Sequence, residues 1–264
     1  MKRLLIVTLA AVLLLGAQTI PPEGKTYTVY LSAVQVSNVK FGLAMPQNLY
    51  YPQDVTAVGA GWWYDWGYSR IGEPGYVPMS WCGKVPAIPE TYAGPLLVFN
   101  EPNIASQCGI TPAEAYARYK VLYAAYPHAD LIPGGVSIFA IDWLETFVDL
   151  LNKGEVPYPN YFHLHAYIEG KTFTFDYIRT NLPKFYELTK RPLWVTEYNV
   201  VGGNPALLRD LKNWLEKQPY VYKHAVFTNR ASTDGWALPG TAIINSDGTL
   251  NASGQAIKSA YPSP

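Results

Sequence analysis

The segment Pro95-Leu96-Leu97-Val98-Phe99-Asn100-Glu101 decides the fold class of this chain. A short apolar run that ends on polar residues is typical of a buried strand. Similar runs recur along the chain, and many are followed by a loop and then by apolar residues at helical spacing. This alternation favours βαβ units and a parallel sheet.

Seven further runs meet the same description, at 40–45, 61–66, 76–81, 131–136, 161–167, 192–197 and 223–229. Together with 95–101 they make eight, which is the strand number of a (β/α)8 TIM barrel. Such barrels commonly take about 250 residues, and this chain has 264. We therefore expect an α/β protein with one compact barrel domain at 39–264.

The helices expected between these strands differ in length. Thr111-Pro112-Ala113-Glu114 is a capping box with proline at the first helical position, and it leads into a helix over 115–125. Apolar residues at helical spacing predict three more helices, at 141–152, 175–188 and 205–215. The early connections are short, and 48–58 is expected to hold a single turn. Some helices of the barrel are thus expected to be reduced.

Charge balance and aromatic content narrow the class of ligand. Twenty basic residues balance twenty acidic ones, so no electrostatic field favours nucleic acid or anionic lipid. The chain has 8 Trp and 21 Tyr, and exposed aromatic rings often stack on flat apolar ligand faces, including those of sugar rings. The alternative is a tyrosine-rich core and surface without a binding role. A neutral ligand fits this composition best.

The N-terminal segment predicts export. Lys2 and Arg3 precede an apolar run from Leu4 to Leu15, which is typical of a signal peptide and short for a membrane span. We expect a signal peptide at 1–18, with an uncleaved anchor as the alternative, and a linker at 19–38. The mature protein is expected to be secreted or extracellular, with the cell surface and the periplasm as alternatives, and to have no membrane contact after cleavage.

Export makes the two cysteines informative. An isolated pair such as Cys82 and Cys108 is a disulfide candidate in an oxidising compartment, and two free thiols are the alternative. His163 and His165 share a face of one expected strand, but the sequence offers no evident third ligand for zinc. We expect the disulfide and no metal site.

Two glutamates stand at the ends of expected strands. Catalytic groups of (β/α)8 barrels lie at the C-terminal ends of the strands. Glu101 ends the fourth expected strand and Glu197 the seventh, so the two side chains can face each other across the barrel mouth. Retaining glycosidases need two carboxyl groups about 5–5.5 Å apart, one to attack the anomeric carbon and one to protonate the leaving oxygen. The alternative is a pair of rim glutamates in salt bridges.

The residues around these glutamates resemble a known family. Asn100-Glu101-Pro102 and Thr196-Glu197-Tyr198 are similar to the motifs at the ends of strands four and seven in clan A glycoside hydrolases. Further segments in the same order resemble glycoside hydrolase family 128, small barrels that act on β-1,3-glucans; they are Lys40-Phe41-Gly42-Leu43-Ala44, Trp62-Trp63-Tyr64-Asp65-Trp66, Tyr76-Val77-Pro78-Met79 and Phe162-His163-Leu164-His165-Ala166-Tyr167. The resemblance covers roughly residues 40 to 240.

The resemblance implies a role for each matching residue. It implies that Glu101 is the acid/base and Glu197 the nucleophile of a double displacement that needs no cofactor and no metal. It also implies that Asn100 binds the sugar 2-hydroxyl, that Tyr167 orients Glu197, and that Trp236 stacks under the sugar at the cleaved bond. Because an acid must carry its proton when substrate binds, we expect the negative charge on Glu197 to raise the pKa of Glu101.

Other side chains near strand ends are candidates for substrate binding. Trp66 and Trp81 are candidates for stacking on a glycan, with core packing as the alternative. Asp65 is a candidate partner for sugar hydroxyls, with a loop-fixing carboxylate as the alternative. His165 is a better site candidate than His163, which lies deeper on the same face and fits a core histidine.

These observations leave three functions open. The first is a monomeric, secreted glycoside hydrolase that cleaves β-1,3-glucan from within the chain. The second is a clan A hydrolase that acts on another glycan, such as xylan or mannan, since specificity depends on loops that motifs do not describe. Asn103 and Tyr198-Asn199, which depart from the more frequent family residues, lie beside the expected pocket. The third is a noncatalytic glycan-binding barrel, which would have no need for two facing carboxylates.

Overall fold

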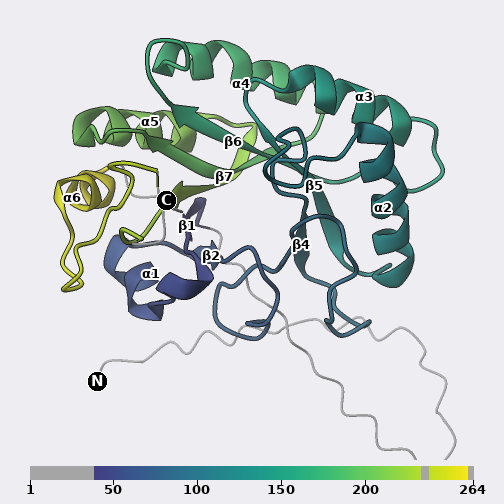
Figure 1. Ribbon diagram of the computed structural model, residues 1–264, viewed down its shortest axis with the longest axis horizontal. Helices are drawn as coiled ribbons and strands as arrows, with labels where there is room; N and C mark the ends of the chain where they lie inside the picture. The colour runs from purple at the N-terminus through teal and green to yellow at the C-terminus, as the bar shows by residue number, and fades with distance from the viewer. Residues whose placement is uncertain (1–38, 233–237, 261–264) are drawn as a thin grey trace, which may run out of the picture. The chain divides into compact units, whose positions relative to one another are not determined.

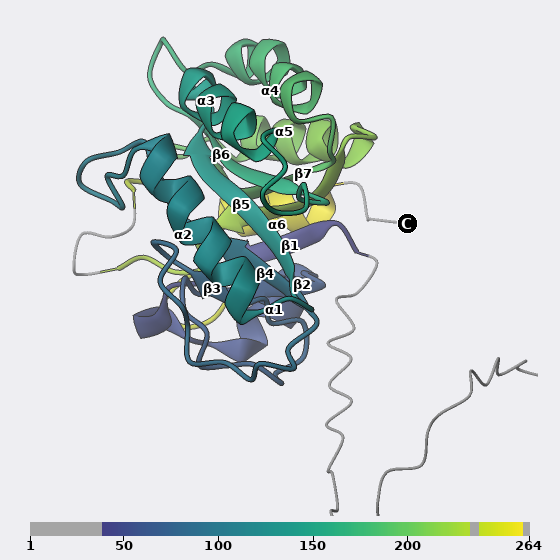
Figure 2. The same ribbon diagram turned by 90° about the vertical axis from the view of Figure 1, so that its right-hand side faces the viewer.

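The computed structural model describes residues 39–232 and 238–260, and these residues form a (β/α)8 barrel (Figures 1 and 2). Its eight parallel strands are β1 (Phe41–Ala44), β2 (Trp62–Tyr64), β3 (Met79–Ser80), β4 (Pro95–Val98), β5 (Asp130–Ser137), β6 (Phe162–Ile168), β7 (Leu193–Val200) and β8 (Val221–Phe227). The predicted fold class is confirmed, and each predicted strand is present. The signal peptide expected at 1–18 and the linker expected at 19–38 lie outside the described residues.

The strands follow the order β2-β1-β8-β7-β6-β5-β4-β3 around the barrel. The two end strands are joined where Trp63 pairs with Tyr76, just before β3. Here the Trp63 amide donates to the Gly75 carbonyl at 2.9 Å, and the Val77 amide donates to the Trp63 carbonyl at 2.9 Å. The sheet is therefore closed by two hydrogen bonds, although β3 itself has only two residues.

Helices are unevenly distributed over the barrel. They are α1 (Pro52–Val58), α2 (Pro112–Ala125), α3 (Ile141–Leu151), α4 (Phe175–Thr189), α5 (Pro205–Lys217) and α6 (Ala252–Ser259), with a short 3₁₀ turn η1 (Gln47–Leu49). No helix separates β2 from β3 or β3 from β4 in the described residues, as expected for a reduced first half. Among the helices that the structure describes, none is long and apolar enough to cross a membrane.

The ends of the helices show which of the predicted helix boundaries are correct. The capping box before α2 is confirmed, because Thr111 Oγ1 accepts from the Glu114 amide at 3.2 Å and Glu114 Oε2 accepts from the Thr111 amide at 2.8 Å. The expected single turn at 48–58 was too short: α1 has seven residues and is capped at its C-terminus by Gly59, whose φ of 75° suits glycine. Helix α6 was not predicted, since its sequence ASGQAIKS has few apolar residues to mark a face.

Side chains pack in two layers, one inside the barrel and one between strands and helices. Trp62 and Tyr64 point inward and Trp63 outward, as alternation along a strand requires. Inside, Trp62 and Trp194 pack edge to face with ring centroids 5.0 Å apart. The other interior residues are Ala44, Val77, Met79, Leu97, Ile132, Ala225 and Phe227. A filled interior leaves the polar side chains of the strands to gather at the mouth.

A disulfide joins Cys82 to Cys108, the pair predicted from the sequence. Cys82 lies just after β3 and Cys108 lies between β4 and α2. The bond therefore ties together two loops at the same end of neighbouring strands, in the part of the barrel that lacks helices.

Candidate active site

A cavity of about 840 Å³ opens at the C-terminal ends of the strands. It contains eight of the predicted site residues, namely Asp65, Trp66, Trp81, Asn100, Glu101, His165, Tyr167 and Glu197. It also contains residues that the sequence did not single out, among them Gln107, Ser137, Phe139 and Phe173. Trp236, the ninth predicted residue, lies outside the described residues.

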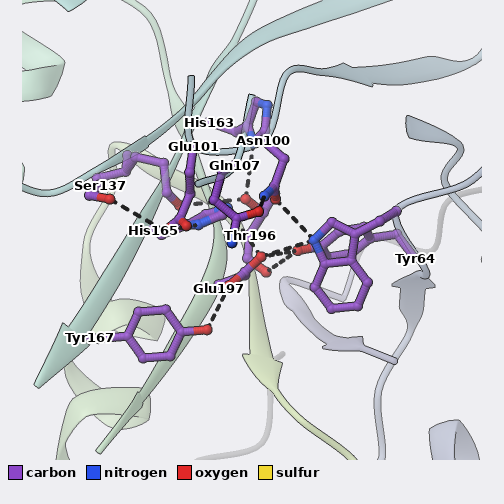
Figure 3. Close-up of polar contacts among 12 residues, drawn as sticks. Tyr64, Asn100, Glu101, Gln107, Ser137, His163, His165, Tyr167, Thr196 and Glu197 are labelled. Carbon is purple, nitrogen blue, oxygen red and sulfur yellow. Dashed lines mark hydrogen bonds and ion pairs between the residues drawn. The ribbon is translucent and has the colours of Figure 1, made fainter. Parts of the chain in front are cut away.

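Glu101 and Glu197 meet the same imidazole. His165 Nδ1 lies 3.2 Å from Glu101 Oε1, and His165 Nε2 lies 3.3 Å from Glu197 Oε1. The first contact has hydrogen-bond geometry, whereas the second is a close charge contact without it. Figure 3 shows both carboxylates beside this buried ring. The glutamates from β4 and β7 therefore lie across the mouth from each other with one basic group between them.

Neutral donors surround the carboxylate of Glu197. The Tyr167 hydroxyl donates to Oε2 at 2.6 Å, the Tyr64 hydroxyl donates to Oε1 at 3.2 Å, and Trp66 Nε1 donates to Oε1 at 3.1 Å. Burial raises the pKa of Tyr64 and of Tyr167 well above the usual range, and the charge of Glu197 adds to this shift, so both hydroxyls keep their protons. These donors hold Glu197 in one orientation without neutralising it.

Burial also raises the pKa of Glu197 itself, which is 7% exposed. The charge of His165 opposes this shift, the charge of Glu101 adds to it, and the hydrogen bonds from Tyr167 and Trp66 oppose it. A carboxylate that is buried among neutral donors is poorly hydrated, which suits a nucleophile.

The expected upward shift in the pKa of Glu101 was wrong. Burial raises this pKa, but the hydrogen bond and charge of His165, with the hydrogen bond from the Ser137 hydroxyl at 3.3 Å, lower it by more. The sequence argument counted only the charge on Glu197 and had no means of placing His165 in contact with Glu101. The net direction is downward, so the resting proton lies elsewhere.

His165 is the group that can hold that proton. Burial lowers its pKa, but the charge of Glu197 and the hydrogen bond and charge of Glu101 outweigh burial, and the pKa is raised above its ordinary value. A cationic His165 between two carboxylates leaves one negative charge in the site. The same total results when the proton sits on Glu101 and the imidazole is neutral.

Asn100 belongs to a second chain of contacts along the cavity wall. Trp66 Nε1 donates to Asn100 Oδ1 at 3.0 Å as well as to Glu197, and Asn100 Nδ2 donates to Gln107 Oε1 at 3.3 Å. The side chain next to Glu101 is therefore held from both of its ends. Gln107 lies in the loop after β4, where no strand-end pattern marks it.

Asp65 has its carboxylate occupied by protein donors. Oδ1 accepts from the Tyr76 hydroxyl at 2.6 Å and from the Gly67 amide at 3.0 Å, and Oδ2 accepts from Arg70 Nε at 3.1 Å. The residue is 1% exposed. This geometry favours the loop-fixing alternative for Asp65 over the sugar-binding role.

The remaining candidates divide between wall and core. Trp81 is half-buried and packs beside the interior layer while it lines the cavity, so its geometry is compatible with both alternatives. His163 is fully buried, with Nδ1 3.0 Å from Thr196 Oγ1 and Nε2 3.0 Å from the Val98 carbonyl. It is the core histidine that the sequence indicated.

Comparisons with known proteins agree with this architecture. The model of the family described as "Glycosyl hydrolase catalytic core" matches residues 42–257. A family 128 subgroup I endo-β-1,3-glucanase from Amycolatopsis mediterranei, in complex with laminaritriose, is similar with a TM-score of 0.67 and 22% identity, over 84% of this chain and 100% of that chain. A subgroup II endo-β-1,3-glucanase from Sorangium cellulosum gives 0.65 and 23%, over 85% and 100%.

A family 128 subgroup VII oligosaccharide-binding protein from Trichoderma gamsii is also similar, with a TM-score of 0.65 and 20% identity, over 86% of this chain and 95% of that chain. No curated protein sequence matches the chain. The structural likenesses support the fold, and the family model, which covers most of the chain, decides the family. The chain belongs to the glycosyl hydrolase catalytic core family.

Proposed function

We propose that this glycoside hydrolase cleaves β-1,3-glucan with retention of anomeric configuration, with Glu197 as nucleophile and Glu101 as acid/base. The observation that carries the proposal is the contact of both glutamates with one buried histidine at the barrel mouth. Their surroundings differ, which is how paired carboxyl groups acquire different roles. The activity described for the Amycolatopsis and Sorangium proteins supports β-1,3-glucan as the substrate.

In the first step Glu197 attacks the anomeric carbon and the glycosidic bond breaks. The leaving oxygen takes its proton from Glu101, to which His165 Nδ1 can pass one over 3.2 Å. A covalent ester between the sugar and Glu197 remains, and the leaving saccharide departs with its new hydroxyl. We propose that Asn100, which Trp66 and Gln107 hold in position, binds the 2-hydroxyl, a contact that strengthens in the transition state.

In the second step water replaces the leaving saccharide. Glycosylation removes the negative charge from Glu197, so Glu101 can accept a proton from the incoming water. The hydroxide attacks the anomeric carbon from the face that the leaving group had occupied, and the Glu197 carboxylate is released. Two inversions give retention, and the site returns to its starting protonation.

The test is the release of reducing sugar from β-1,3-glucan, with xylan and mannan in parallel, by the native chain and by Glu197→Gln. We expect release from β-1,3-glucan alone, at least 10³-fold slower in the variant, and a product that proton NMR first records as the β-anomer. Release from xylan or mannan instead would discard the substrate. A first product in the α-configuration would discard the double displacement.

The alternative of a noncatalytic glycan-binding barrel is favoured by one observation, the similarity to the Trichoderma oligosaccharide-binding protein. A pure binder gains nothing from a nucleophile that three donors orient, so we place this function second. Binding of laminari-oligosaccharides by the native chain without any bond cleavage over days would establish it.

We further propose that the protein is exported. The charged and apolar start of the sequence supports this, and the Cys82–Cys108 disulfide suits an oxidising compartment. Fractionation of the native host with an antibody to the barrel would test it, and a full-length reduced protein in the cytoplasm would refute it.

A further inference from the structure

Two phenylalanine rings stand at one rim of the cavity without a role in the chemistry. Phe139 follows β5 and Phe173 lies in the turn between β6 and α4. Their centroids are 5.3 Å apart with an interplanar angle of 30°, and both line the cavity. Phe139 is 49% exposed, although burying a phenylalanine ring is favourable by roughly 1.5–3 kcal/mol. A stacked pair beside an active site, with Phe139 exposed and Phe173 half-buried beneath it in the same cavity wall, is a surface suited to the flat face of a ligand.

Backbone hydrogen bonds fix the two segments that bear these rings. The Phe173 amide donates to the Glu169 carbonyl at 3.2 Å, and the Glu169 amide donates to the Phe173 carbonyl at 2.9 Å. The segment that bears Phe139 is held by the Ile138 amide, which donates to the His165 carbonyl at 2.9 Å. The Tyr177 ring also packs on Phe173, with centroids 5.4 Å apart. A platform that is already ordered loses little entropy when a ligand binds.

The position of this pair relative to the two glutamates tells which end of a glycan it would meet. Glu101, as acid, must lie on the side of the leaving saccharide. Ser137, at the end of β5, contacts Glu101 Oε1, and Phe139 comes two residues later. Two of the three donors to Glu197 come instead from β2 and the loop after it, and the third, Tyr167, comes from β6, which precedes Phe173. A chain that runs from Glu197 past Glu101 therefore continues toward Phe139.

We propose that Phe139 and Phe173 form the platform that binds the leaving-group end of the glycan. The inference rests on the proposed function, since it uses Glu101 as the acid. The platform acts in both half-reactions. It holds the saccharide that leaves in the first step, and in the second step it holds a saccharide that competes with water for the glycosyl-enzyme.

The second half-reaction isolates the platform from the rest of the site. A β-laminaribiosyl fluoride donor occupies the side of Glu197 and has only fluoride as leaving group, so its hydrolysis does not use the platform. Laminaribiose added as acceptor does use it. We expect Phe139→Ala to lower the ratio of transfer to hydrolysis about tenfold, the equivalent of about 1.4 kcal/mol, while hydrolysis of the fluoride alone changes by less than about twofold.

Two control variants keep the result specific. Phe139→Tyr retains the ring and should keep the native ratio. Tyr222→Ala removes another exposed aromatic side chain, 43% exposed, from the start of β8 at the opposite end of the barrel, and should also keep it. Thermal unfolding of each variant excludes a general loss of fold.

The outcomes separate the two proposals. An unchanged ratio in Phe139→Ala, with a native enzyme that uses the donor, would overturn the platform and leave the proposed function standing. Equal losses of transfer and of fluoride hydrolysis would place Phe139 on the side of Glu197 and would also overturn it. A native enzyme that neither hydrolyses the fluoride nor cleaves β-1,3-glucan would remove the proposed function itself.

Discussion

Tyr167→Phe removes one hydrogen bond from the proposed nucleophile and almost nothing else. The lost contact is the shortest that Glu197 makes, at 2.6 Å to Oε2, while Trp66 and Tyr64 still donate to Oε1. A hydrogen bond to a buried charged group contributes about 1.5–3 kcal/mol. We therefore expect kcat/KM on β-1,3-glucan to fall about 10- to 150-fold, with little change in the melting temperature.

The same substitution should also shift the pH dependence of kcat/KM, in a direction that follows from the structure. The Tyr167 hydrogen bond lowers the pKa of Glu197, so its loss raises that pKa further. Because Glu197 attacks as a carboxylate, the acidic limb of the kcat/KM profile must move to higher pH. Each 1.36 kcal/mol of lost stabilisation of the charged form corresponds to one pH unit, which gives a shift of about 1–2 units.

Tyr198→Phe is the matched control for this experiment. Tyr198 directly follows Glu197 on β7 and is fully buried on the outer face of the strand. Its hydroxyl has no hydrogen-bond partner within the described residues. We expect it to leave the pH profile unchanged. If Tyr167→Phe also leaves the acidic limb in place, or moves it to lower pH, then the orientation and charge of Glu197 do not depend on Tyr167.

Three predictions concern stability and are checked by urea unfolding. Reduction of Cys82–Cys108 should lower the free energy of unfolding by about 3.5 kcal/mol in the chain-entropy model, and a double Ser variant should no longer respond to reductant. Burial lowers the pKa of His163 to about 3, so its neutral form stabilises the fold above pH 6.5, and this contribution is lost as the pH falls. The loss in the free energy of unfolding should be roughly 3 kcal/mol at pH 4.5. His163→Asn should flatten that slope, and an equal slope would exclude His163 as its source. Asp54→Asn breaks a buried ion pair in which Arg230 Nη2 lies 2.8 Å from Asp54 Oδ1. It should lower the free energy of unfolding by about 3–5 kcal/mol, whereas a loss below about 1 kcal/mol would show that the pair is not desolvated.

The strand-end rule explains why so much of this site could be predicted from the sequence. A run such as 95–101 shows both the buried strand and the polar residues that leave it, so one pattern locates the element and the site. The two residues that become neighbours only after closure, Glu101 and Glu197, could be paired because barrel geometry places the fourth and seventh strands across the mouth. The geometry of the barrel, and not a local sequence pattern, thus predicted that residues 96 positions apart in the sequence lie close together.

The sequence did not predict which hydrogen-bond partners the side chains meet across the barrel mouth. Tyr64 and Ser137 are ordinary strand residues in the sequence, and only register places their hydroxyls at the carboxylates. Asp65 ends a strand just as a site residue would, yet Tyr76 and Arg70, from the connection that follows it, occupy its carboxylate. A strand-end position therefore predicts that a side chain reaches the mouth, but not which groups it meets there.

The pKa of Glu101 is lowered by a contact of this kind, with His165, which the sequence could not predict. This contact changes which group holds the proton that the acid must deliver. If the site held only the two carboxyl groups, Glu101 would have to stay protonated at the pH of the solution in order to act as the acid. With His165 in contact with both, the site needs only one proton among three groups, and the transition state decides whether Glu101 or His165 carries it. Negative charge that develops on the leaving oxygen attracts the proton toward Glu101 when it is needed. The alkaline limb of the pH profile should accordingly belong to Glu101 and His165 together. His165→Gln should move this limb to lower pH, because the group whose pKa is raised is no longer present to retain the proton.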